Sequence, residues 1–353
     1  MSGAPPLHDL ACVVHLHSTY SDGTGTVPEI AAAGRRAGAD VVLLTDHDSL
    51  EARRRGEEGW YGPTLLLAGV EVSPAGRNHY LAFGIDEEVD HEGLDGAGIC
   101  RAVRERGGFG FAAHPFSEGS RRFAERARAM PFESLDCDAL GGIELWSFLN
   151  DTLEPMESLR EIARFIVAPG RVVRQPPERN VRAWEELCRT RRVVALGGLD
   201  AHQIGVRVAG RVPLRLMGYA RSFRHLRTHV LCPEAPSGEL EADRAQVFDA
   251  LREGRCYIAH DWLAPARGFA FWASGASGEE LPMGGEAPAG EWTLRVSAPR
   301  PCSLRIVRDG EVLAQADSAH LELDVAEPGV CRAEAHLGGR TWVISNPVYL
   351  RAA

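Results

Sequence analysis

The feature that most constrains the fold is a series of short apolar runs, each followed by polar side chains. These runs alternate with longer stretches rich in Ala, Arg and Glu. Such alternation is typical of β–α–β units and predicts an α/β fold with a mostly parallel sheet or barrel. The strands are expected at Ala11–Leu16, Val41–Thr45, Thr64–Val72, Tyr80–Gly84, Gly108–Ala113, Gly142–Leu145 and Val193–Leu199.

The stretches between the runs have the composition of helices. Pro28–Ala37 has a proline in its first turn, where the missing N–H costs no hydrogen bond. Leu94–Arg106 and Val181–Arg189 are also rich in helix-forming residues. A further helix is expected at Gln246–Arg252, followed by a strand at Arg255–Ala259.

The pattern changes after about residue 265, where strands follow one another without helices. Several of these strands alternate apolar and polar residues, and Asp309-Gly310 is a two-residue hairpin signal. We therefore predict two domains, an α/β domain at 1–265 and a small antiparallel β-sandwich at 266–353. The sandwich strands are expected at Trp292–Ala298, Cys302–Arg308, Glu311–Ala316, His320–Val325 and Val330–Leu337.

The bulk composition is globular and excludes some classes of partner. The formal charge of −10 argues against non-specific nucleic-acid binding, although bound metal ions would reverse the field locally. Neither a long apolar stretch nor an N-terminal leader pattern predicts membrane insertion or secretion. The eight cysteines form no CxxC pair, which is typical of reduced thiols, so a cytoplasmic location is expected.

Residues able to bind metals follow almost every predicted strand. His15 and His17 are two apart and would face the same side of an extended strand. Because the carboxyl ends of parallel strands meet on one face, residues far apart in sequence would converge there. Neutral His with Asp or Glu suits Zn, Mn or Fe, and a carboxylate can bridge two ions. The other candidates are Asp22, His47, Glu71, His79, His114, Glu144, Asp200 and His202.

These residues lie in motifs that resemble those of the polymerase and histidinol phosphatase (PHP) superfamily. The resemblance covers about residues 11–260, with the motifs in the family's order and at similar spacing. It implies a distorted (β/α)7 barrel that holds up to three metal ions. The motifs are His15-Leu16-His17 with Ser21-Asp22-Gly23, Thr45-Asp46-His47, Gly69-Val70-Glu71, Ala113-His114-Pro115 and Leu199-Asp200-Ala201-His202.

The resemblance also implies which residues bind the first two metals. The first metal would take His15, His17, Glu71 and Asp200. The second would share Glu71 and add His114.

The third metal would take Asp22, His47 and His202. The remaining ligand of the second metal is expected to be His79, and Glu144 is the alternative. Glu144 could instead orient a ligand imidazole as a hydrogen-bond acceptor.

A second resemblance concerns the downstream part of the chain. Trp184-Glu185-Glu186-Leu187, the segment Phe248–Arg255 and Ser345-Asn346-Pro347 are similar to a subgroup that includes carbaryl-hydrolase-type enzymes. Members of that subgroup pair the barrel with a small C-terminal β domain, which implies the same arrangement here.

The combined hypothesis is a metal-dependent phosphoesterase. We expect cleavage of a small phosphate mono- or diester by a hydroxide that bridges two of two or three divalent ions, Mn, Fe or Zn. Glu71, Asp200 and His202 are the expected catalytic residues. Arg207 and Arg211 are candidate phosphate-binding residues, and solvated loop arginines are the alternative reading of this pair.

Two other functions stay open at this stage. The same centre could hydrolyse a carbamate, ester or amide, an option that the downstream resemblance favours. A non-catalytic metal-binding module is the other, and the intact ligand motifs argue against it. Asp46 and Asp48 are expected to hold His47 or to move protons, and specificity is expected to lie in Phe116–Pro131 and Gln203–Tyr219.

Overall fold

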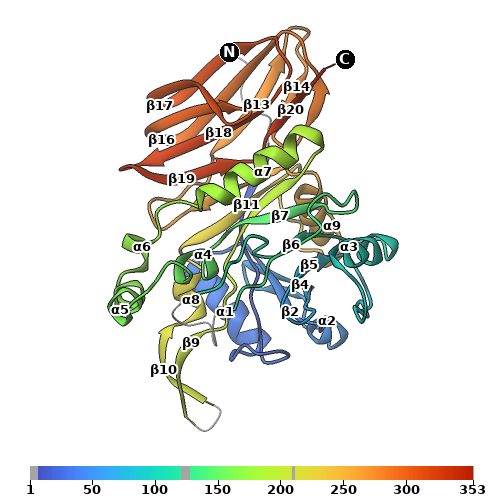
Figure 1. Ribbon diagram of the computed structural model, residues 1–353, viewed down its shortest axis with the longest axis vertical. Coiled ribbons are helices and arrows are strands. Elements are labelled where there is room, and N and C mark those ends of the chain that lie inside the picture. The colour runs from blue at the N-terminus through green and yellow to red at the C-terminus, as the bar shows by residue number, and fades with distance from the viewer. Residues whose placement is uncertain (1–6, 121–127, 209–210, 353) are drawn as a thin grey trace.

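The computed structural model describes residues 7–120, 128–208 and 211–352, with the backbone alone between 204 and 216. It is a mixed α/β fold, the class that the sequence predicts. The strands β13–β20 gather at one end of the molecule, and the helices lie with the remaining strands at the other (Figure 1). Among the helices in the described ranges, none is long and apolar enough to cross a membrane.

The strands predicted in the N-terminal part are all present, with ends shifted by a few residues. The hairpin strand β3 and the later strands β9, β10 and β11 were not predicted. The observed bounds are β1 His8–Val14, β2 Val41–His47, β3 Gly59–Tyr61, β4 Thr64–Val72, β5 Tyr80–Phe83, β6 Phe109–Ala112, β7 Gly142–Ser147, β8 Val194–Gly198, β9 Ile204–Val208, β10 Arg211–Met217, β11 Leu226–Cys232 and β12 Cys256–His260.

The strand pairing brings several carboxyl ends to one edge. β1, β2 and β4 pair in parallel, as do β6, β7 and β8, while β5 runs antiparallel between β4 and β6. Beyond β8 the chain returns to the end of β1, where Leu199 donates its N–H to Val14 and His17 donates to Ala201. The first and last of these strands therefore meet at their carboxyl ends.

The predicted helices are also present, and their ends explain why they form. Thr26 and Glu29 form a capping box at the start of α1, and Gly38 ends this helix in a left-handed conformation with φ 71°. α9 begins earlier than predicted. The observed bounds are α1 Val27–Ala37, α2 Glu51–Arg54, α3 Gly96–Glu105, α4 Asn150–Leu153, α5 Leu159–Val167, α6 Pro169–Val172, α7 Glu178–Thr190, α8 Tyr219–Ser222 and α9 Leu240–Arg252.

The C-terminal region is all β, but two of its predicted boundaries are wrong. A register shift between Ser297 and Cys302 lets one long strand, β16, continue through two expected strands. β17 likewise continues through two expected strands. The turn at Asp309-Gly310 is confirmed, with φ 52° at Asp309 and 90° at Gly310. The observed bounds are β13 Ala270–Gly275, β14 Glu280–Pro282, β15 Glu286–Pro288, β16 Trp292–Arg308, β17 Glu311–Val325, β18 Gly329–Leu337, β19 Arg340–Ser345 and β20 Val348–Arg351.

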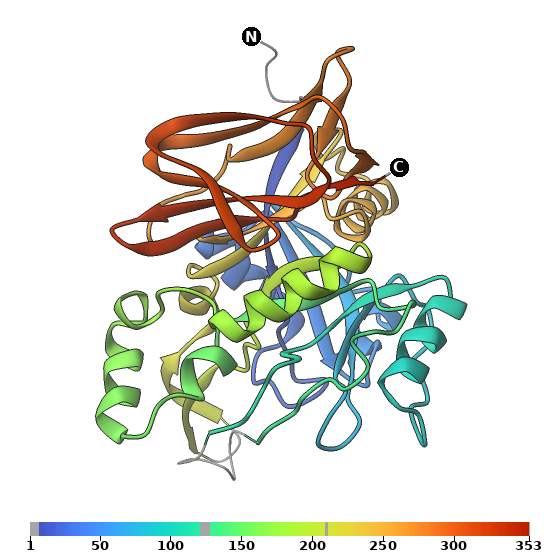
Figure 2. The ribbon, with the colours of Figure 1, turned by 45° about the horizontal axis from the view of Figure 1, so that its top comes forward.

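Helix α7 lies between the C-terminal strands and the rest of the molecule in both views (Figures 1 and 2). Arg332 of β18 forms an ion pair with Glu185 of α7. The β12–β19 pairing also connects the two regions, with Tyr257 opposite Ser345. Hydrogen bonds and ion pairs thus join the two parts of the chain.

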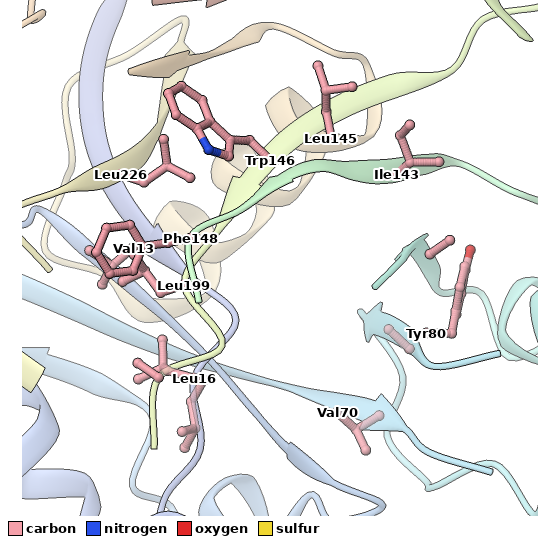
Figure 3. Close-up of a cluster of buried hydrophobic side chains, with 14 of the residues drawn as sticks. Val13, Leu16, Val70, Tyr80, Ile143, Leu145, Trp146, Phe148, Leu199 and Leu226 are labelled. Carbon is pink, nitrogen blue, oxygen red and sulfur yellow. The ribbon is translucent and has the colours of Figure 1, made fainter. Parts of the chain in front are cut away.

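A buried apolar cluster fills the space beside the converging strand ends. It includes Val13 and Leu16 near the end of β1, Phe148 after β7 and Leu199 after β8 (Figure 3). Each of these side chains is at most 2% exposed. The cluster fixes the backbone from which the polar residues of the next section project.

Candidate metal centre

The strand ends bring every predicted metal ligand into one connected cluster. His15 and His17 follow β1, their ring centroids 5.4 Å apart. Other pairs of ring centroids lie 4.1 to 6.1 Å apart. The four overlapping groups of possible ligands are His17/Asp22/His47/His202, His15/His17/Glu71, His15/His114/Asp200 and His47/Glu71/His79.

Glu71 lies at the middle of this cluster and is fully buried. Its Oε2 lies 3.3 Å from the Nε2 atoms of both His15 and His17. Its Oε1 lies 2.9 Å from His79 Nδ1 and 3.4 Å from His114 Nε2. A carboxylate with imidazoles beside each oxygen is placed to bridge two metal ions.

Asp200 contributes the second central carboxylate. Its Oδ1 lies 3.4 Å from His15 Nε2, 3.2 Å from His17 Nε2 and 3.5 Å from His202 Nδ1. Its Oδ2 accepts a hydrogen bond from Asn150 Nδ2 at 2.9 Å. Asn150 begins α4, directly beyond β7, and was not predicted as a site residue.

The third group lies at the open edge of the cluster. Asp22 Oδ1 is 3.0 Å from His202 Nε2 and 3.7 Å from His47 Nε2, and the Asp22 side chain is 60% exposed. This group matches the ligand set expected for the third metal. Its exposure distinguishes it from the buried residues around Glu71.

Hydrogen bonds on the far side of several rings orient them. His15 Nδ1 donates to Glu144 Oε1 at 3.1 Å, which leaves its Nε2 turned towards Glu71. Glu144 Oε2 accepts the backbone N–H of His114 at 2.7 Å. Since both Glu144 oxygens are used in this way, its placement favours the orienting role and leaves His79 as the better ligand.

His47 and His202 are oriented through other partners. His47 Nδ1 lies 2.7 Å from Ser73 Oγ, and this hydroxyl donates to the Glu71 carbonyl oxygen. His202 Nδ1 donates to the backbone carbonyl of Asp200 at 3.0 Å. His47 Nδ1 also lies 3.2 Å from Glu71 Oε2, and in both rings Nε2 faces Asp22.

The expectation that Asp46 or Asp48 holds His47 is wrong. Asp46 accepts from the N–H and the hydroxyl of Ser18, both at 2.6 Å, and therefore fixes the loop after the HxH motif. Asp48 accepts the N–H of Ser73. The serine, not either aspartate, contacts His47.

Three of the clustered residues adopt left-handed backbone conformations. φ is 63° at His15, 31° at His114 and 50° at Asp200. Such values are uncommon for residues other than glycine and cost of order 1–3 kcal/mol each. They also show that His15 and His17 converge through a bend after Val14 and not through the simple strand alternation that we predicted.

The charges in the cluster shift several pKa values. Burial lowers the pKa of His17 to about 4. Burial opposes protonation of His202 as well, but the carboxylates of Asp200 and Asp22 raise its pKa to about 9. Burial would raise the pKa of Asp200, yet the neighbouring histidines, His15 first, hold it well below its usual range.

This donor set fits divalent metal ions. Within the described residues, neither nitrogen of His17 makes a hydrogen bond, nor does Nδ1 of His114, although all three atoms are buried. Buried polar atoms without partners are costly, and divalent cations bind neutral imidazoles and carboxylates together. The cluster therefore supports binding of divalent metal ions.

A cavity of about 690 Å³ opens onto the cluster. Its floor includes His47, Glu71 and Asp200, and its walls include Met130, which lies in the segment Phe116–Pro131. Met217 adds to the lining from the segment Gln203–Tyr219. Helices α4 and α5 also line it, a contribution that the sequence analysis missed.

The two predicted phosphate-binding arginines are not placed. Arg207 and Arg211 lie in the antiparallel hairpin of β9 and β10, where the side chains are outside the described part of the structure. Their role stays a prediction.

Comparison with known proteins gives structural neighbours only. No family model matches the chain, and the search of curated proteins gives no match. A two-domain protein from Bacteroides vulgatus, described as containing a predicted PHP-like metal-dependent phosphoesterase, has a TM-score of 0.48 and 15% identity, covering 98% of this chain and 97% of its own.

Two further solved structures match a smaller share of the chain. One, from Bifidobacterium adolescentis, is described as a candidate metal-dependent phosphoesterase, with TM-score 0.37, 19% identity and coverage of 57% and 89%. The other is an amidohydrolase from Chromobacterium violaceum with bound sulfate and no metal, with TM-score 0.31, 17% identity and coverage of 54% and 87%. The description of the Bacteroides vulgatus protein includes the superfamily that the motifs resemble, but the likeness of all three structures to the chain is low. The function proposed for the chain rests on the side chains of the metal centre.

Proposed function

We propose that the chain is a metal-dependent hydrolase that cleaves a small phosphate mono- or diester with two or three divalent ions, Mn, Fe or Zn. The observation that carries this proposal is the convergence of His15, His17, His114, Glu71 and Asp200 beneath an open cavity, with buried ring nitrogens that lack hydrogen-bond partners. When bound, such ions lower the pKa of water and polarise a phosphoryl oxygen.

The chain's own residues have distinct parts in this proposal. Glu71 would bridge the metal ions of the two inner sites. Asp200 would bind a metal ion with one carboxylate oxygen while Asn150 holds the other oxygen. With the two inner ions bound, His202, half-buried beside Asp22, would hold or release a substrate proton at the edge of the cluster, and with three ions its Nε2 would bind the outer one. Arg207 and Arg211 are proposed to approach the phosphate from the hairpin.

The expected domain architecture is part of the same proposal. The strand run from β1 to β8, and the hydrogen bonds of Leu199 and His17 across its two ends, support a distorted barrel. A separate apolar cluster that includes Leu294, Leu304 and Trp342 supports a C-terminal sandwich at 266–353.

Hydrolysis of p-nitrophenyl phosphate and bis-p-nitrophenyl phosphate with added Mn²⁺ tests the proposal. We expect turnover by the metal-loaded protein that disappears in His17→Ala and Asp200→Ala, with both variants still folded by circular dichroism. Bound metal without turnover of either substrate would contradict the phosphoesterase assignment.

A second candidate is a carbamate, ester or amide hydrolase on the same centre. Arg128 is the one arginine or lysine among the described residues that line the cavity, and much of the remaining lining is apolar. Such a lining also suits an uncharged substrate, whose carbonyl a binuclear centre would polarise. Release of alcohol or amine in place of phosphate would distinguish this candidate.

A further inference from the structure

The cavity over the metal centre has one polar side and one apolar side. The polar side consists of the metal-binding cluster, and Ser120, Arg128, Asn150 and Glu154 are further polar lining residues. The apolar side comes mainly from α4, α5 and the segment just before α4. Its apolar lining residues are Met130, Leu149, Leu153, Leu159, Ile162, Phe165, Ile166 and Met217.

Helix α5 turns an apolar face to this cavity. Leu159, Ile162 and Ile166 follow one another at helical spacing and share one face of the helix. Phe165 anchors the helix, since it is 1% exposed and its ring lies 5.7 Å from that of Phe148. Figure 1 shows α5 at the periphery of the molecule, beyond α4.

The protein core covers this face only in part, with Ile162 packed against it. Leu159 is 70% exposed even though it lines the cavity, and Ile162 and Ile166 are only partly buried. Apolar side chains gathered in a concave site are typical of ligand recognition. The capping box of Ser158 and Glu161 fixes the start of α5, so the face is held in place.

Glu154 and Asn150, two polar residues along this wall, are engaged elsewhere. Glu154 accepts from Ser117 Oγ at 2.6 Å and pairs with Arg179 at 2.9 Å. Asn150 donates to Ser147 and to Asp200. The wall therefore offers a ligand mainly apolar contact.

We propose that the substrate carries a bulky apolar group, an aromatic ring or a branched alkyl chain, that lies against the α4–α5 wall next to the reacting bond. This inference rests on the proposed hydrolase function, and it deepens that function by naming the chemistry of the group. A polyhydroxylated group such as a sugar would leave its hydroxyls facing Leu159 and Ile162 without partners, which is unfavourable.

Calorimetric binding to the Mn²⁺-loaded protein tests the inference without turnover. Two pairs of probes differ only in the apolar group: phenylphosphonate against methylphosphonate, and benzohydroxamate against acetohydroxamate. We expect the aromatic member of each pair to bind roughly tenfold more tightly, as burial of a ring against apolar side chains predicts.

Helix α5 offers a matched pair of variants. Leu159 lines the cavity, while Val167 on the same helix is 77% exposed and lies outside the cavity lining. Leu159→Ser should reduce the aromatic preference by about threefold or more, and Ile162→Ala further, whereas Val167→Ser should leave it unchanged. Because Leu159 and Val167 are both exposed, neither change threatens folding.

The outcomes separate this inference from the proposed function. If the aromatic and aliphatic probes of both pairs bind with nearly equal affinity, and bis-p-nitrophenyl phosphate is hydrolysed normally, the inference is overturned but the proposed function stands. Preference for benzohydroxamate without phosphate-ester turnover would support the apolar wall and contradict the phosphoesterase assignment. Failure of all four probes to bind would overturn both.

Discussion

The two ends of β1 each carry a buried cluster of histidine and carboxylate side chains, and the two clusters are built differently. At the amino end, His229 of β11 lies between Asp9, 2.6 Å from its Nδ1, and Asp261, 3.2 Å from its Nε2. Tyr257 donates to Asp9 at 2.6 Å, and Arg227 pairs with Asp261 at 3.2 Å. Both nitrogens of the ring are thus engaged.

At the carboxyl end, histidines outnumber the carboxylates between them. Glu71 and Asp200 are shared among several rings, and both nitrogens of His17 lack a hydrogen bond within the described residues. A cluster whose charges and hydrogen bonds balance is complete by itself, whereas one with surplus imidazoles requires cations. The same residue types therefore form an ion network at one end and a candidate metal centre at the other.

The largest effect on activity is expected when one histidine of the metal centre is removed. His17→Ala should lower kcat/KM by about 10³-fold or more, because the attacking water loses its lowered pKa. The free energy of unfolding of the metal-free protein should change little, since the side chain of His17 makes no hydrogen bond in the described structure. Steady-state kinetics and urea denaturation measure the two effects. A loss of unfolding free energy as large as the one predicted for the ion network would contradict the contrast between the two clusters.

The opposite result is expected in the ion network. Asp261→Asn leaves His229 and Arg227 without their shared carboxylate and should lower the free energy of unfolding by about 3–5 kcal/mol. Metal content should be unchanged, because Asp261 contacts none of the clustered ligands. Urea denaturation with metal analysis of the same sample checks both statements. Loss of bound metal in this variant would contradict the contrast between the two clusters.

The pH dependence of stability provides a third test. Burial opposes protonation of His229, but Asp261 and Asp9 raise its pKa to about 9 from 6.5. A raised pKa in the folded state means that this stabilisation is complete below about pH 6.5 and is lost as the pH rises through 9. The difference in unfolding free energy between the metal-free wild type and His229→Asn should be on the order of 3 kcal/mol at pH 6 and should shrink by pH 10. A difference that does not depend on pH would contradict a charged His229.

A smaller effect is expected where a residue only orients a ligand. Glu144→Gln keeps the shape of the side chain but replaces one of the two accepting oxygens with a donor NH2, so either His15 or the His114 N–H loses its acceptor, which should reduce metal affinity by about 10–100-fold. Competition with a fluorescent chelator measures this affinity. If affinity falls as far as in His17→Ala, Glu144 is itself a ligand and the preference for His79 is wrong.

Sequence reasoning reached the ligands because they follow strands in short motifs. Strand ends meet in space, so Glu71 and Asp200 could be expected together although they lie far apart in the chain. Ser73 and Asn150 also follow strands, but single serine and asparagine residues carry no metal-binding pattern. Sequence alone therefore predicts the position of the centre better than the hydrogen bonds that orient it.

The network around His229 and the apolar wall were not predicted, for physical reasons. Asp9, His229 and Asp261 lie on three different segments, and only the pairing of β1 with β11 and of β11 with β12 brings them together. The α5 face shows helical spacing in sequence, but burial against a core and exposure to a cavity produce the same pattern.

Metal analysis of the purified protein tests the central claim most directly. After reconstitution with Mn²⁺ and removal of excess metal, mass spectrometry of the elements should find two to three equivalents per chain in the wild type and in His229→Asn, and at least one fewer in His17→Ala. Less than one equivalent in the wild type, or an unchanged content in His17→Ala, would contradict the assignment of the His/Asp/Glu cluster as a metal centre.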